Sequence, residues 1–174
     1  MNDVKYFIKE RVPLPANTTL ATGLILSVQS LFAQSIPLSS ILSMALTLVL
    51  FITELRFMDE LKDYEKDKVA NPTRPLPSGK ISTQMVSSLV NGTFLLLIGT
   101  TIYSYFQANS LAAALLGSSL IWLFLMYKEF FIPKLINKSP FFYAVTHQIV
   151  IVPIVLFVIA TLNPELVWTT KSLG

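Results

Sequence analysis

The sequence predicts an all-α protein, a polytopic transmembrane helical bundle with about five spans. Of its 174 residues, 53% are apolar and only 13% are charged. The charged residues are clustered, and none occurs between residues 12 and 53 or between residues 81 and 127. A third block, residues 139–164, holds only His147 as an ionisable group. A membrane span needs about 20 apolar residues, so the first two blocks are each long enough for two spans and the third for one. A soluble helical bundle would instead place charges on the outer face of every helix.

The spans follow from these blocks and from the prolines and polar turns within them. A lead-in with a short amphipathic helix precedes the first span. Pro37 stands at the start of the second, where a helix tolerates proline. Pro153 lies inside the last and predicts a kink there. We expect one transmembrane domain over residues 1–174, with spans at residues 16–34, 38–57, 83–105, 111–127 and 139–162 and a polar loop at 58–82.

The basic residues fall almost entirely on one side of these spans. They precede the first span, follow the second and follow the fourth, and only Lys171 falls on the other side. The positive-inside rule then places the amino terminus and the 58–82 loop in the cytoplasm, for a protein of the plasma or inner membrane. Basic residues confined to membrane-flanking segments argue against nucleic-acid binding. The absence of cysteine excludes disulfides and thiolate metal sites.

The polar segment beyond the second span carries the candidate chemistry. Asp59, Asp63 and Asp67 recur every four residues, so a helix that continues the span would stack their carboxylates on one face, with Glu60 beside them. Like charges at this spacing destabilise a helix unless something positive neutralises them. Mg²⁺ is one such partner, because it prefers oxygen ligands and is often held by one or two carboxylates plus substrate phosphates. Pairing with nearby lysines explains the same spacing.

The rest of this segment is predicted to be a constrained loop. Asn71-Pro72 should end the acidic helix, because the residue before a proline is pushed out of the helical region. From Arg74 to Gly79, two prolines fix φ and the glycine can adopt a positive φ. Within the preceding span, Glu54 and Arg56 are costly unless they are paired or face a wet cavity.

Two motifs here resemble the UbiA superfamily of intramembrane prenyltransferases. Residues 59–67, Asp-Glu-x-x-Asp-x-x-x-Asp, are similar to the family's first aspartate-rich motif. Residues 74–82, Arg-Pro-Leu-Pro-Ser-Gly-Lys-Ile-Ser, are similar to the loop that follows that motif. Arg11-Val-Pro13 resembles the family's opening. Asp59 and Glu60 stand where the family usually has asparagine and aspartate, and the family's second aspartate-rich motif has no counterpart in this sequence.

The resemblance implies Mg²⁺-dependent transfer of a prenyl group from a polyprenyl diphosphate to an acceptor, aromatic or lipid-like. Such an enzyme is a transferase of alkyl groups other than methyl, working in membrane lipid. By position, Asp59, Glu60, Asp63 and Asp67 would bind the metal, and Arg74 would bind diphosphate. Asp63, Asp67 and Arg74 are thus the expected catalytic residues.

The second half of the sequence contains four additional candidates for substrate binding. Lys128 and Lys134 could contact phosphate, although anchoring at the membrane surface explains them equally well. His147 is an ionisable group inside a span, and Tyr143 lies one helical turn before it, so both could face a central cavity. A histidine satisfied by neighbouring helices is the alternative.

Two other functions stay open at this point. A non-catalytic membrane protein that binds or transports divalent cations would use the same acidic face. A half-bundle would build its site only with a partner chain or as a homo-oligomer.

Overall fold

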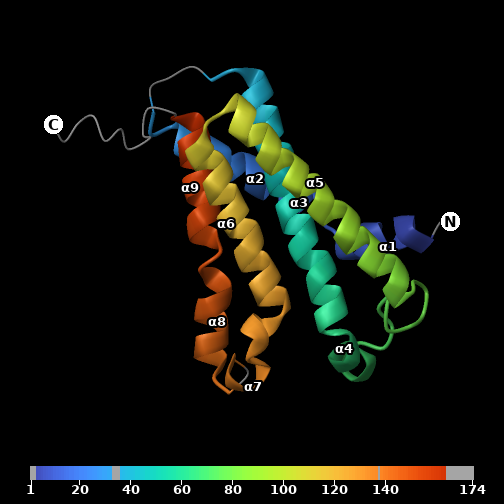
Figure 1. Cartoon of the computed structure of the whole chain (residues 1–174). Helices are drawn as coiled ribbons and strands as arrows, with labels where there is room; N and C mark the ends of the chain where they lie inside the picture. Colours follow the sequence, from blue (N-terminus) through green and yellow to red (C-terminus); the bar gives the residue numbers. More distant parts are fainter. Residues whose placement is uncertain (1–2, 33–35, 137, 164–174) are drawn as a thin grey trace. The chain divides into compact units, whose positions relative to one another are not determined.

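The fold is given by a computed structural model, which describes residues 3–32, 36–136 and 138–163. Every regular element in these ranges is a helix (Figure 1), so the predicted all-α class is confirmed. The chain divides into two compact units. Unit 1 comprises Met1–Thr22 and Ala45–Leu97, and unit 2 comprises Gly23–Met44 and Ile98–Gly174. The single transmembrane domain expected for residues 1–174 stays a prediction.

Four helical segments among the described residues are long and apolar enough to cross a membrane, and they coincide with predicted spans two to five. The helix of the second span continues beyond residue 57, as predicted, but it ends at Lys62 and does not reach Asp67. The helix at the first predicted span, α2 (Leu14–Gln29), has 16 residues. At 1.5 Å per residue it is about 24 Å long, less than the hydrocarbon thickness of about 30 Å. Residues 33–34 of that prediction, and Lys171, lie outside the described residues. The four segments are α3 (Leu38–Lys62), α5 (Thr83–Gln107), α6 (Ser110–Tyr127) and Pro140–Leu162.

The last of these segments is broken where Pro153 predicted a kink. It consists of α8 (Pro140–Gln148) and α9 (Ile151–Leu162). Pro153 has no N–H for the carbonyl of Ile149, four residues earlier, and its ring crowds that carbonyl. The Ile149 carbonyl instead accepts a hydrogen bond from the Val152 N–H at 3.0 Å. The predicted kink is therefore confirmed.

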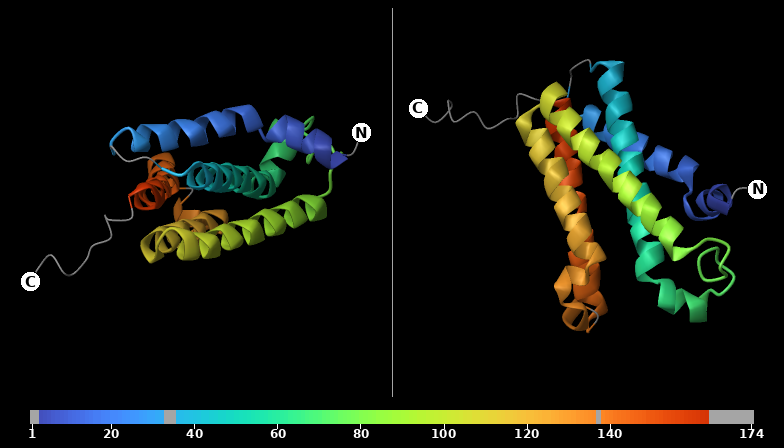
Figure 2. Two further views of the ribbon diagram at one scale, coloured as in Figure 1. Left: turned by 90° about the horizontal axis from the view of Figure 1, so that it is seen from above. Right: turned by 45° about the vertical axis from the view of Figure 1, so that its right-hand side comes forward.

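In unit 1, two short helices flank the end of α3 (Figures 1 and 2). The predicted amphipathic lead-in forms α1 (Asp3–Arg11). Its Phe7 is fully buried and stacks on Phe57 of α3, with ring centroids 5.9 Å apart. On the other side of Lys62, α4 (Tyr64–Ala70) ends before Asn71, as predicted. Gly79 in the following loop has a φ of +76°, so this expectation is also confirmed.

In unit 2, α6 packs along α9. The first turn of α6 is fixed by Asn109, whose Oδ1 accepts from the Ala112 N–H at 2.7 Å. The Nδ2 of Asn109 donates to the carbonyl of Ala160 on α9 at 2.8 Å. One side chain thus caps one helix and ties it to the other.

A left-handed turn, η1 (Glu129–Phe131), follows α6 and leads to α7 (Pro133–Ile136). Its three residues have φ values of +46°, +54° and +59°. Residues other than glycine rarely adopt such values. Ring contacts with α6 accompany the turn. Phe130 meets Trp122 edge-on at 5.3 Å between centroids, and Phe131 lies 6.4 Å from Phe124.

Candidate functional site

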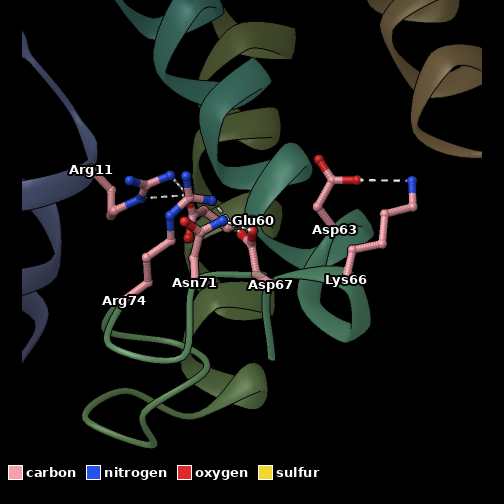
Figure 3. A network of polar contacts seen from close by, with 7 residues as sticks. All are labelled: Arg11, Glu60, Asp63, Lys66, Asp67, Asn71 and Arg74. Atoms are coloured by element: carbon pink, nitrogen blue, oxygen red, sulfur yellow. Dashed lines mark hydrogen bonds and ion pairs between the residues drawn. The ribbon is translucent and has the colours of Figure 1, made fainter. Parts of the chain in front are cut away.

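Two arginine–carboxylate pairs meet where α1, the end of α3, α4 and the following loop come together in unit 1 (Figure 3). The Nε of Arg11 donates to Glu60 Oε1 at 2.6 Å, and its Nη2 lies 2.5 Å from the same oxygen. The Nη1 of Arg74 donates to Asp67 Oδ2 at 2.5 Å. The other oxygen of Asp67 accepts from Asn71 Nδ2 at 2.8 Å. Two cations from distant parts of the sequence thus neutralise two of the predicted metal ligands.

The local backbone explains why the other two acids lie apart from this cluster. Helix α3 ends at Lys62, and α4 begins only at Tyr64, so the helix is interrupted at Asp63. Asp63 lies away from the cluster and pairs with Lys66 at 3.4 Å (Figure 3). Asp59 pairs with Lys62 at 3.5 Å. The expectation that the aspartates stack on one face of a continuous helix is wrong, because the chain turns between them.

Burial separates the four acids in the same way. Glu60 is only 6% exposed and Asp67 only 7% exposed, whereas Asp59 and Asp63 are partly open to solvent. The second oxygen of Glu60, Oε2, is buried and has no hydrogen-bond partner within the described structure. One acceptor position is therefore left open in the centre of the cluster.

The charge state of Asp67 follows from its neighbours. Burial by itself would raise the pKa of Asp67, but the hydrogen bonds from Asn71 and Arg74 and the charges of Arg74 and Arg11 act in the opposite direction. The pKa of Asp67 lies below its ordinary value as a result. This carboxylate is ionised at neutral pH and can serve as a fixed negative partner for a cation.

The described residues contain no group of three or more acids and histidines close enough to hold a metal ion together. Their carboxylate oxygens are nevertheless the ligands that Mg²⁺ prefers. Mg²⁺ commonly takes only one or two carboxylates from a protein, with substrate phosphates and water completing its shell. With Glu60 Oε2 open beside Asp67, the donor set fits an ion of this kind.

The four substrate-binding candidates of the second half belong to unit 2. Tyr143 and His147 stack at 3.9 Å between ring centroids. The Nδ1 of His147 lies 2.8 Å from the Tyr143 carbonyl oxygen. Lys128 lies over the Tyr127 ring at 5.0 Å, and Lys134 is exposed on α7. Their binding of substrate stays a prediction.

Arg11 and Asn71 were not among the predicted site residues. Asn71 was interpreted only as a helix end, although an amide one turn after a buried acid can bind that acid. The signal for Arg11 was its position in Arg11-Val-Pro13, the last charge before the charge-free block. A cation at that place needs an acidic partner when the first helix folds onto the bundle.

Comparison with known proteins agrees with the resemblance that residues 59–67 and 74–82 indicated. A sequence model of the UbiA prenyltransferase family matches residues 17–171. The chain is also similar to the digeranylgeranylglyceryl phosphate synthase of Methanococcus aeolicus, with 36% identity over 67 residues. That match covers 38% of this chain and 23% of the relative's length. No solved structure matches the chain.

Proposed function

The chain belongs to the UbiA prenyltransferase family, and we propose that it binds a prenyl diphosphate beside α1, α3 and α4 for transfer of the prenyl group to an acceptor. The observation that most supports this proposal is the pair of buried carboxylates, Glu60 and Asp67, each held by an arginine. The positive-inside rule favours entry of the diphosphate from the cytoplasmic side.

The donor groups of the two arginines support this proposal. A guanidinium presents five N–H donors in a planar fork that matches phosphate oxygens. Arg74 gives Nη1 to Asp67, and Arg11 gives Nε and Nη2 to Glu60, which leaves other donors of each fork for a ligand. The carboxylates orient the guanidinium groups, so a diphosphate would bind to cations that are already positioned.

The acids would serve a second purpose when a metal is present. Glu60, Asp63 and Asp67 would hold Mg²⁺, with Asp63 turning from its long contact with Lys66. Bound Mg²⁺ would supply positive charge against the oxygens of the departing diphosphate. Asp59 would complete the acidic edge of the site.

The reaction itself would rely on charge held in place by this chain. As the allylic C–O bond breaks, negative charge grows on the diphosphate, where Arg11 and Arg74 would stabilise it. Positive charge grows on the prenyl carbon at the same time. The stacked rings of Phe7 and Phe57 lie one turn from the Arg11–Glu60 pair along α1 and α3, and aromatic faces attract cations.

The similar protein from Methanococcus aeolicus is named as a digeranylgeranylglyceryl phosphate synthase. By analogy, a lipid-like acceptor is the better candidate for this chain than a water-soluble aromatic acid.

Binding of labelled geranylgeranyl diphosphate to the detergent-purified chain, in Mg²⁺, tests the proposal. Arg74→Lys keeps the charge but loses the fork, so affinity should fall by about tenfold or more, the effect of a charge-assisted hydrogen bond. Glu65→Gln is the matched control, because Glu65 lies on α4, is 78% exposed and pairs with Lys68. Unchanged affinity in Arg74→Lys, or equal losses in both variants, would contradict the proposal.

A further inference from the structure

Glu54 is a buried acid that the diphosphate site does not use. It lies on α3, six residues before Glu60. The residue is 0% exposed, and neither Oε1 nor Oε2 has a hydrogen-bond partner within the described structure. Buried carboxyl groups normally have partners, because removing them from water without compensation is costly. Two acceptor positions are therefore open on the buried side of a membrane-spanning helix.

The surroundings of Glu54 on α3 are apolar. Phe51, one turn before it, and Met58, one turn after it, are both buried. Arg56 is the charged residue nearest in sequence, but it is exposed, and residues two positions apart do not face each other on a helix. An ionised carboxylate in such a place would be far costlier than the neutral acid. A ligand for Glu54 should accordingly be uncharged.

A buried hydrogen-bond donor without a partner in the described structure lies in the same unit as Glu54. Asn17 on α2 is 2% exposed, and its Nδ2 donor has no hydrogen-bond partner within the described structure. Asn17 follows Arg11 by six residues, Glu54 precedes Glu60 by six residues, and the Arg11–Glu60 pair joins the two segments. An unfilled donor and two unfilled acceptors are thus equally far along the chain from the diphosphate site.

We propose that Glu54 and Asn17 bind a hydroxyl group of a lipid-like acceptor. A hydroxyl is the small uncharged group that can donate to a carboxyl oxygen and accept from an amide N–H at once. At 1.5 Å per residue, Glu54 lies about 9 Å along α3 from Glu60. A diphosphate held near Glu60 would extend its first prenyl carbons over this distance, so the hydroxyl would lie beside the reacting end. This proposal rests on the proposed function of the Glu60–Asp67 cluster.

The first test is chemical labelling of the wild-type chain in detergent at neutral pH. Dicyclohexylcarbodiimide reacts with protonated carboxyl groups in apolar surroundings, and peptide mass spectrometry locates the product. Glu54 should be labelled, whereas Glu60, which is also buried but paired with Arg11, is the internal control and should not be. A folded chain without label at Glu54 would overturn the proposal, because a ligand site must be reachable from the membrane.

Protection from the label then identifies the ligand group. The probe is 1-O-octadecylglycerol, which carries two hydroxyls, and its control is the same ether with both hydroxyls methylated. The hydroxyl form should slow labelling of Glu54, and the methylated form should not. In Asn17→Leu the protection should weaken by about fivefold, the effect of one lost hydrogen bond. Equal protection by both ethers, or full protection in Asn17→Leu, would refute a hydroxyl site.

Two variants separate this role from a structural one. Glu54→Met removes an uncompensated polar group, so the melting temperature should stay the same or rise. Glu54→Gln should bind labelled geranylgeranyl diphosphate as tightly as the wild type does. A lower melting temperature in Glu54→Met would show a structural partner for the carboxyl, and lost diphosphate binding in Glu54→Gln would place Glu54 in the diphosphate site. Either result overturns the proposal.

If the wild type binds no diphosphate, the proposed function fails, and the protection experiment still decides whether Glu54 binds a hydroxyl.

Discussion

Substitution of Asp67 by asparagine tests the charge cluster without a ligand. Asparagine has nearly the same shape as aspartate but no charge. Its oxygen can still accept the hydrogen bond from Asn71, whereas the ion pair with Arg74 is lost. We expect Asp67→Asn to fold but to be less stable than the wild type, since Arg74 would keep its charge without its partner.

The expected loss follows from the burial of the two partners. Breaking a fully buried ion pair costs about 3–5 kcal/mol, because the remaining charge is left uncompensated. Asp67 is buried, but about a third of the Arg74 side chain is exposed (32%), so water can solvate part of that charge. A hydrogen bond to a charged group contributes about 1.5–3 kcal/mol. We therefore expect the free energy of unfolding to fall by about 2 kcal/mol.

The assay is unfolding of the detergent-solubilised chain by titration with sodium dodecyl sulfate, followed by far-ultraviolet circular dichroism. Glu65→Gln again serves as the control, since its exposed pair with Lys68 should contribute only about 0–0.5 kcal/mol. In the double variant with Arg74→Gln, the two changes should not add, and the coupling should be about 1–3 kcal/mol. Equal losses in Asp67→Asn and Glu65→Gln, with additive double variants, would refute the pairing.

Two further predictions concern acid stability and the broken helix. Because the pKa of Asp67 is below its ordinary value of about 3.8, its contribution to stability is complete above that pH and is lost as pH falls through the lower folded value. The wild type should thus lose stability below about pH 4 more steeply than Asp67→Asn, and parallel curves would contradict this. Trp122→Phe removes the indole N–H that donates to the Thr146 carbonyl at 3.0 Å, so the free energy of unfolding should fall by about 1–2 kcal/mol in the same titration. An unchanged titration midpoint would show that the carbonyl finds another donor.

Features that depend on neighbouring residues in the sequence were predicted well. The four later spans were predicted from the charge-free blocks, because a membrane span needs a charge-free length that can be counted directly in the sequence. Pro153 gave the break before α9, because a missing donor acts four residues away on the same helix. Asn71-Pro72 and Gly79 gave the end of α4 and the positive φ for similarly local reasons.

Features that depend on distant residues were not predictable in this way. The pair between Arg11 and Glu60 joins residues 49 apart, and nothing near either residue specifies the other. The interruption at Asp63 has no local sequence signal, because residues 59–70 contain neither proline nor glycine. The left-handed turn starting at Glu129 contains no glycine, which is the usual sign of positive φ.

The central claim is that the cluster around Glu60 and Asp67 forms a metal-dependent diphosphate site. Its most direct test is equilibrium binding of labelled geranylgeranyl diphosphate to the purified wild-type chain, in Mg²⁺ and in an excess of chelator. We predict saturable binding in Mg²⁺ that falls at least about tenfold with chelator, because the acids would then repel the diphosphate. No saturable binding in Mg²⁺, or the same affinity in chelator, would contradict the claim.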